Sequence, residues 1–69
     1  MEVIYLREDF IKLGQALKAA GFVENGADAK LEINEGLVKV NGETETRRGR
    51  KLYDGDTVEY NGEKIEIKK

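Results

Sequence analysis

The chain contains no histidine, cysteine, serine, proline or tryptophan. Nucleophilic catalysis by a serine or cysteine activated through histidine is therefore excluded. Because thiolate and imidazole ligands are missing, the usual zinc sites are excluded as well, and so are disulfides. Carboxylates are plentiful, but on a small open domain they are usually solvated. The sequence therefore predicts a protein that is not an enzyme, that holds no metal or cofactor, and that has no small-molecule substrate.

Two features that would direct a chain to a membrane are also missing. No apolar run approaches the roughly 20 residues needed to cross a bilayer. The first residues, MEVIYL, lack the basic stretch that opens a secretion signal. We expect a cytoplasmic protein without a membrane partner.

The length and composition favour one small folded domain. With 69 residues, of which 39% are hydrophobic, the chain is expected to form a single unit over residues 1–69. The net charge is −2, but residues 12–51 carry eight bases and six acids, whereas the segment on each side sums to −2. A polyanion responds to the local field of a patch rather than to the overall charge. The composition therefore permits a nucleic-acid partner.

The pattern between residues 12 and 36 predicts two short helices. Four apolar residues have the spacing of one helix face: Leu13, Ala16, Leu17 and Ala20. Gly21 is a natural residue at which to end this helix, and Gly36 ends the second in the same way. Asn25 is positioned to cap the second helix, with Asp28 three residues later as its partner and as a charge suited to the helix dipole.

The remaining segments read as short strands joined by tight turns. The strands are expected at residues 2–6, 38–40, 43–46, 57–60 and 63–68. Asn41-Gly42 and Asn61-Gly62 are strong hairpin signals, because both positions of such a turn need φ > 0. Asp54-Gly55-Asp56 is a turn rather than a calcium loop, since the later ligands are missing. The predicted fold class is α+β, with a helical hairpin packed on a small, mostly antiparallel twisted sheet.

Four basic residues within five positions form the strongest candidate for a functional site. We call Arg47, Arg48, Arg50 and Lys51 the basic cluster. A run of like charges is usually a solvated loop, but three of these residues are arginines, whose fork geometry suits phosphate. Gly49 interrupts the cluster and allows the backbone to approach a ligand closely. We expect phosphate binding here.

Other lysines could extend this surface. Lys30 and Lys39 are expected to flank one groove if the helical hairpin packs on the strand, and Lys12 and Lys18 lie at the edge of the expected patch. Taken alone, each of these lysines is more often an ordinary surface residue than a binding residue.

The three tyrosines could in principle stack on bases. Tyr5 and Tyr60 occupy strand positions, where tyrosines are more often half-buried in the core. Only Tyr53, beside the basic cluster, is a candidate for stacking.

Several short motifs, in this order, resemble a known family. They are Ala29-Lys30, Ile33, Gly36, Val38-Lys39-Val40-Asn41-Gly42, Leu52, Gly55-Asp56 and Val58. Together they resemble the S-four RNA-binding domain, named for a small-subunit ribosomal protein. The segment from Glu45 to Leu52 resembles a free-standing bacterial subgroup of YaaA/YbcJ type, in which one such domain is the whole protein.

The resemblance implies a fold with the αL RNA-binding motif and a function in RNA binding without catalysis. It implies structured RNA, ribosomal or transfer RNA above all, as the partner of a monomeric module. The family typically has Arg-Leu-Asp at the first helix and Ser-Arg at the second, whereas this chain has Lys12-Leu13-Gly14 and Asn25-Gly26. Gly26 at a helix N-terminus leaves backbone N–H groups that could bind phosphate. 

Two other classes of function remain open from the residues alone. The same basic patch could make the protein an adaptor for an acidic protein surface. A small carrier of the β-grasp kind fits the size, but such carriers end in two glycines and this chain ends in Lys68-Lys69.

Overall fold

The computed structural model describes residues 2–69, which form two helices and two β-sheets. The main sheet has five strands, in the order β1 (Glu2–Tyr5), β7 (Glu63–Lys68), β6 (Thr57–Tyr60), β3 (Val38–Val40) and β4 (Glu43–Thr44). β1 runs parallel to β7, and the other pairs are antiparallel. The α+β class and the mostly antiparallel sheet are confirmed. The returning strand β4 is shorter than predicted, because the side chain of Glu45 binds the backbone N–H groups that follow it.

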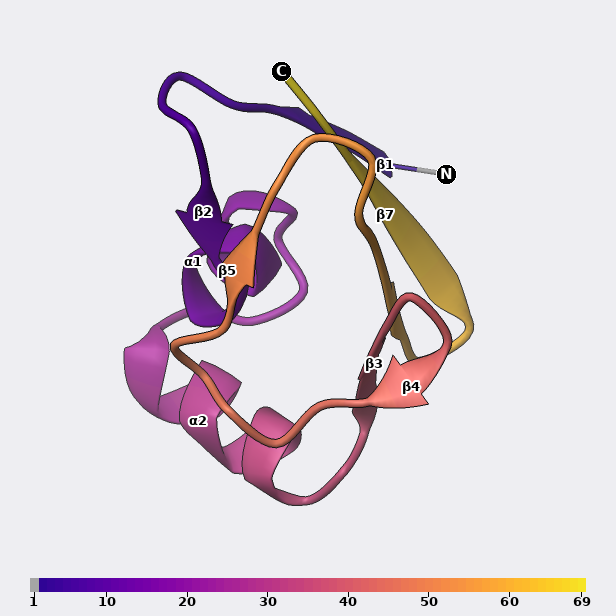
Figure 1. The fold of residues 1–69 in the computed structure, drawn as a ribbon. Helices are drawn as coiled ribbons and strands as arrows, with labels where there is room; N and C mark the ends of the chain where they lie inside the picture. Colours follow the sequence, from indigo (N-terminus) through magenta and orange to yellow (C-terminus); the bar gives the residue numbers. More distant parts are fainter. Residues whose placement is uncertain (1) are drawn as a thin grey trace.

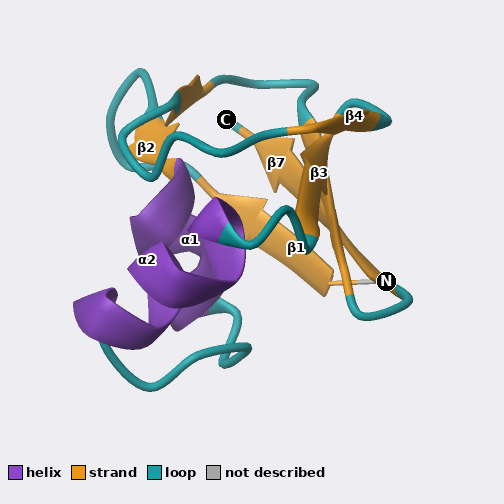
Figure 2. Cartoon of the chain, turned by 90° about the horizontal axis from the view of Figure 1, so that it is seen from below, coloured by secondary structure: helices purple, strands orange, loops and turns teal. Residues whose placement is uncertain are grey.

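The helical hairpin has the predicted bounds to within a residue. α1 (Leu13–Ala19) is followed by Gly21 at φ 78°, and α2 (Gly26–Asn34) is followed by Gly36 at φ 79°. The side chain of Asn25 accepts a hydrogen bond of 2.9 Å from the backbone N–H of Asp28, as the predicted cap requires. Figure 2 shows the two helices side by side, on one side of the strands.

Both helices and the strands contribute to one core. Its fully buried side chains are Leu13, Ala16, Leu17, Ala29, Ile33, Val38, Val40, Leu52, Val58, Ile65 and Ile67. The alternation predicted for β3 is confirmed, because Val38 and Val40 are buried and Lys39 is exposed. The burial of this apolar surface is what holds α1, which is too short to be stable alone, in place.

A side-chain network joins two of the motifs that lie far apart in the sequence. Asn41 and Gly42 adopt φ 52° and 84° in the hairpin after β3, as predicted. The Nδ2 group of Asn41 donates to Asp56 at 3.1 Å, and its Oδ1 accepts from the backbone N–H of Thr57 at 2.9 Å. Asp56 also accepts from the backbone N–H of Tyr53 at 2.8 Å. The hairpin asparagine and the Gly-Asp turn therefore form one structural unit.

A second sheet was not expected from the sequence. β2 (Ile11–Lys12) pairs antiparallel with β5 (Lys51–Leu52), and each strand has two residues. The pairing brings the end of the basic cluster next to the start of α1 (Figure 1).

Candidate nucleic-acid interface

The loop between β4 and β5 carries the basic cluster and lies against the start of α1. In Figure 1 this segment runs from β4 past α2 to β5. The backbone N–H of Leu13 donates to the carbonyl of Arg50 at 2.8 Å, and that of Gly14 donates to the carbonyl of Arg48 at 3.1 Å. N–H groups in the first turn of a helix have no partner within the helix. The loop satisfies two of them, and its backbone is thereby fixed to α1.

A buried carboxylate organises half of the basic cluster. Glu45 is 6% exposed, and its carboxylate accepts from Arg47 Nε at 3.0 Å, Arg47 Nη2 at 3.1 Å and Arg50 Nη1 at 2.9 Å. It also accepts from the backbone N–H groups of Thr46 and Arg47. The hydrogen bonds from Arg47, together with the one from Arg50, outweigh the opposing effect of burial and lower the pKa of Glu45 to about 2. Arg47 and Arg50 are therefore partly neutralised.

The side chain of Arg48 lies on α1 at a glycine. A Cβ atom on Gly14 would come within 2.7 Å of Arg48 Cγ, which is closer than real Cβ contacts allow. Gly14 is buried under this side chain although it lies in the first turn of the helix. The absence of a side chain at position 14 is what lets Arg48 occupy this place.

Arg48 and two lysines line a shallow hollow that we call the basic hollow. Its volume is about 270 Å³, and its lining residues are Lys12, Gly14, Gln15, Lys18, Gly26, Arg48 and Gly49. Three of them are cations and none is acidic. The hollow thus brings together Lys12 and Lys18, expected at the edge of the patch, Gly26, expected to offer backbone N–H groups, and Arg48 and Gly49 from the segment of the basic cluster.

Lys51 joins the basic hollow to an aromatic pair. It lies directly opposite Lys12 across the β2–β5 ladder, and its Nζ atom lies 4.8 Å above the centre of the Phe10 ring. The rings of Phe10 and Tyr53 are 6.0 Å apart, and Tyr53 is 49% exposed. The candidate role of Tyr53 stays a prediction. Tyr60 is half-buried as expected, but Tyr5, at 70% exposed, is not.

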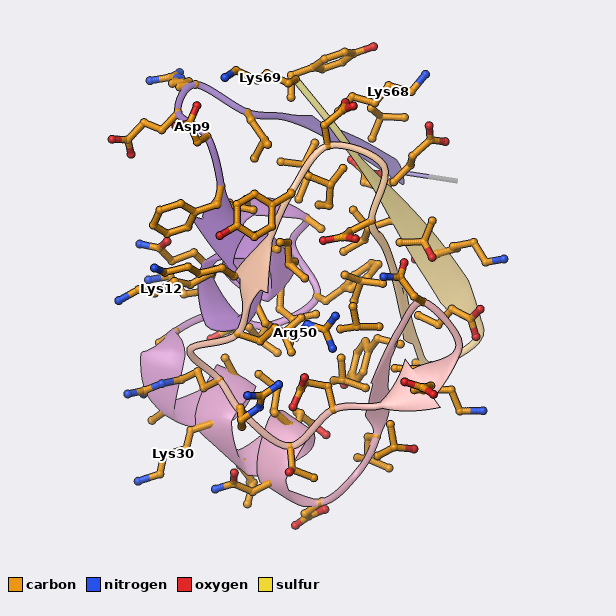
Figure 3. The ribbon with its side chains drawn as sticks, viewed as in Figure 1. Asp9, Lys12, Lys30, Arg50, Lys68 and Lys69 are labelled. Carbon is orange, nitrogen blue, oxygen red and sulfur yellow. The ribbon has the colours of Figure 1, made fainter. Side chains whose placement is uncertain are left out.

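The two remaining lysines do not share a groove. Lys30 lies on the exposed surface of α2, and Figure 3 shows Lys12 and Lys30 extending from the same side of the molecule. Lys39 lines a different hollow with residues of β6 and β7, to which Lys30 does not contribute. The expected groove between Lys30 and Lys39 is therefore wrong, because Lys39 lies on β3 opposite Glu59 of β6 and lines a hollow formed with residues of β6 and β7.

Ion pairing distinguishes the cations of this surface from Lys64 and Lys68 on β7 and from Lys69. Lys64, Lys68 and Lys69 pair with Glu59, Glu66 and Asp9 at 3.6, 3.4 and 2.6 Å. Within residues 2–69, no carboxylate pairs with Lys12, Lys18, Lys30, Arg48 or Lys51. A cationic surface without counter-charges is typical of a site for a polyanion.

Three features of the site were not predicted from the sequence: the contact of Gly14 with Arg48, the lining residue Gln15, and the burial of Glu45. A glycine inside a helical pattern can have a packing reason, and the contact of Gly14 with Arg48 is such a reason. No local signal distinguishes Glu45 from the exposed Glu43.

The described part of the chain has neither a membrane-spanning helix nor a cluster of metal ligands. None of its helices is long and apolar enough to span a bilayer. Residues 2–69 contain no group of three or more carboxylates arranged to hold a metal ion.

Fold and site together define a small α+β domain whose helical hairpin and adjoining loop present unpaired cations. The model of the S4 domain family matches residues 4–68, and the chain belongs to this family. The family resemblance seen in the sequence is thereby confirmed.

Two relatives and one solved structure are similar to this chain. The probable ribosome maturation protein RlbA of Bacillus subtilis (strain 168) is 48% identical over 59 residues, which cover 86% of this chain and 83% of RlbA. The putative RNA-binding protein YbcJ of Escherichia coli (strain K12) is 42% identical over 57 residues, covering 83% and 81%. The solution structure of E. coli YbcJ, described as having an αL motif involved in RNA binding, superposes with a TM-score of 0.76 at 37% identity. That match covers 100% of this chain and 89% of YbcJ.

Proposed function

We propose that this protein is a non-catalytic module that binds structured RNA through phosphate and shape contacts at the basic hollow. The observation that carries the proposal is the set of cations there, which have no carboxylate partner within residues 2–69. Membership of the S4 domain family and the similarity to a putative RNA-binding protein support it.

The chemistry of the hollow suits the backbone of an RNA helix. Double-stranded RNA is recognised mainly by its shape and by contacts to phosphates and 2′-hydroxyl groups, because its deep groove is closed to side chains. Arg48 offers a planar fork to a phosphate, while Lys12 and Lys18, which line the same hollow, act as point charges. Gly26 adds an unhindered backbone at the start of α2, where N–H groups attract anions.

The partner we propose is ribosomal or transfer RNA, bound by a monomer in the cytoplasm. The similarity to a probable ribosome maturation protein favours ribosomal RNA of the two. Arg47 and Arg50 contribute to this function mainly through Glu45, and Lys30 and Lys51 extend the cationic surface beyond the basic hollow.

The proposal is tested by measuring the affinity of purified protein for fluorescent fragments of ribosomal RNA and for transfer RNA. Lys18→Ala combined with Arg48→Ala should weaken binding by more than about tenfold, since two charged contacts are lost. Lys64→Ala combined with Lys68→Ala removes the same charge from the sheet and serves as the control. Unchanged affinity of the first variant would refute RNA binding at the basic hollow.

A further inference from the structure

A second and larger hollow lies beside the basic one and is lined mainly by apolar side chains. It has a volume of about 640 Å³ and lies between β1, the connection that follows it, and α1. Ile4, Leu6 and Ile11 line it and are half-buried, and two aromatic residues, Tyr5 and Phe10, also line it. We call it the apolar hollow. Its volume is in the range of pockets that hold small organic groups.

Two residues of α1 line both hollows. Gln15 and Lys18 are three positions apart on the helix, and each borders the basic hollow and the apolar hollow. They therefore form a ridge between the two sites. A polymer whose phosphates lie in the basic hollow reaches the apolar hollow by crossing this ridge.

The rim of the apolar hollow favours an anionic partner over an ordinary apolar one. Lys18 and Arg7 stand at this rim against a single carboxylate, Glu8. Phe10 also links the apolar hollow to the basic surface. It lines the apolar hollow, and the ammonium group of Lys51 lies over its ring. Aromatic and apolar surface next to backbone-binding cations is the arrangement on which single-stranded bases stack.

Within the RNA-binding function proposed above, we propose that the apolar hollow takes an unpaired nucleobase. Bases inside a duplex are stacked and paired, so only a bulged or terminal nucleotide presents an aromatic face that can enter the hollow. Gln15 lies on the ridge, and because its Oε1 accepts from the backbone N–H of Lys12 at 3.4 Å, its amide NH2 group is the part left to bind the polar edge of such a base. The RNA class that fits both hollows is a helix with an unpaired nucleotide beside it.

The test compares two stem-loop RNAs that differ by one bulged nucleotide. The bulged base is 2-aminopurine, whose fluorescence reports stacking. The wild-type protein should bind the bulged RNA about tenfold more tightly than the uninterrupted stem and should quench the probe, as expected for one base stacked on protein.

Variants at exposed positions separate the two hollows. Tyr5→Ala, and Ala19→Gln, which fills space without adding charge, should remove the preference and the quenching while binding to the uninterrupted stem is unchanged. Arg48→Ala should weaken binding of both RNAs by the same factor. Leu31→Ala, at a side chain that is 57% exposed on α2, is the control for loss of an exposed apolar group.

The possible failures of this inference and of the proposed function are distinct. Equal affinity of the wild type for both RNAs overturns the inference and leaves RNA binding intact, whereas no binding of either RNA overturns the proposed function. A preference that persists in both hollow variants also overturns the inference. So does a dimer in analytical ultracentrifugation that Ala19→Gln dissociates, because a second copy of the chain would then cover the hollow.

Discussion

Glu45 is the only charged residue that is buried within residues 2–69, and it lies inside the most basic segment of the chain. Taking a carboxylate out of water is costly unless charged hydrogen-bond donors compensate it. Arg47 and Arg50 supply three such bonds and the backbone supplies two more. The carboxylate thereby fixes the course of the loop that carries Arg48 to α1.

Glu45→Gln should destabilise the fold and change its response to acid. The wild-type carboxylate has its pKa lowered from 4.5 to about 2, so it stabilises the fold fully above pH 4.5 and loses this contribution as the pH falls towards 2. The variant should lose about 1–3 kcal/mol at neutral pH and show a flatter decline between these pH values. Urea denaturation at a series of pH values measures both effects.

Glu43→Gln is the matched control, because Glu43 is an exposed carboxylate two residues away. It should leave the stability and its acid dependence close to those of the wild type. Equal pH profiles for wild type and Glu45→Gln would contradict the role assigned to the buried carboxylate.

Gly14 and Arg48 form a second pair whose members depend on each other. Alanine at position 14 would raise the helix propensity of α1 by up to about 1 kcal/mol. Its methyl group would also displace Arg48, whose Cγ lies 2.7 Å from the required Cβ position. Intrinsic helix stability and the position of the arginine are therefore opposed at this residue.

A double-mutant cycle tests this dependence. Gly14→Ala should weaken RNA binding by about as much as Arg48→Ala, roughly tenfold for a charged contact. In the Arg48→Ala background it should have little further effect, because the displaced side chain is already gone. Gly49→Ala, which meets no atom within 4 Å, is the control for a methyl group added in the basic hollow. Fully additive effects on binding would show that Gly14 does not act through Arg48.

At the scale of elements, the β2–β5 ladder places two lysines opposite each other. A pair of two-residue strands is marginal alone, and like charges facing each other across strands destabilise the pairing. The ladder is supported by the bond between Leu13 and Arg50 and by the buried Leu52 opposite Ile11. Lys12 and Lys51 thus keep cations at the basic surface at some cost in stability.

Lys12→Glu should stabilise the protein and weaken RNA binding. The new carboxylate would face Lys51 across the ladder and lie at the N-terminus of α1, gaining about 0.5–1 kcal/mol. The reversed charge in the basic hollow should lower RNA affinity more than tenfold, since one attraction becomes a repulsion. Thermal denaturation and RNA titration measure the two effects.

Lys39→Glu is a control with the opposite pattern. It places a carboxylate opposite Glu59 across β3 and β6, so the fold should lose a few tenths of a kcal/mol. RNA affinity should change little, because Lys39 lines another hollow. If Lys39→Glu weakened binding as strongly as Lys12→Glu, the proposed interface would have to extend across the sheet.

At the scale of the whole molecule, the features that were predictable are those fixed by local sequence. The Asn25 cap and the Asn41-Gly42 turn involve neighbouring residues, so their geometry follows from residue type. The β2–β5 ladder joins segments far apart in the chain and has too few residues to show a pattern. The direction of each arginine could not be predicted either, because it depends on where the fold places Glu45 and Gly14.

The fold also sorts charge between its surfaces, although the chain as a whole is acidic. Lysines on β7 and at the C-terminus are paired with carboxylates, whereas those near α1 have no such partner within residues 2–69. Charges further apart than a Debye length of about 8 Å are largely screened at physiological ionic strength. The acidic remainder of the molecule therefore opposes RNA binding only weakly in the cell.

The salt dependence of RNA binding should show how many cations of the basic surface contact phosphates. On a duplex, each phosphate that is neutralised adds about −0.9 to the slope of log K against log salt concentration. We therefore expect a slope of roughly −3 to −4 if four cations each bind one phosphate, namely Lys12, Lys18, Arg48 and Lys51. Arg48→Ala should reduce the magnitude by about one. Arg47→Ala should leave the slope nearly unchanged, because Arg47 is engaged by Glu45. A slope near zero, or one that Arg47→Ala and Arg48→Ala reduce equally, would contradict the division of the basic cluster seen in the structure.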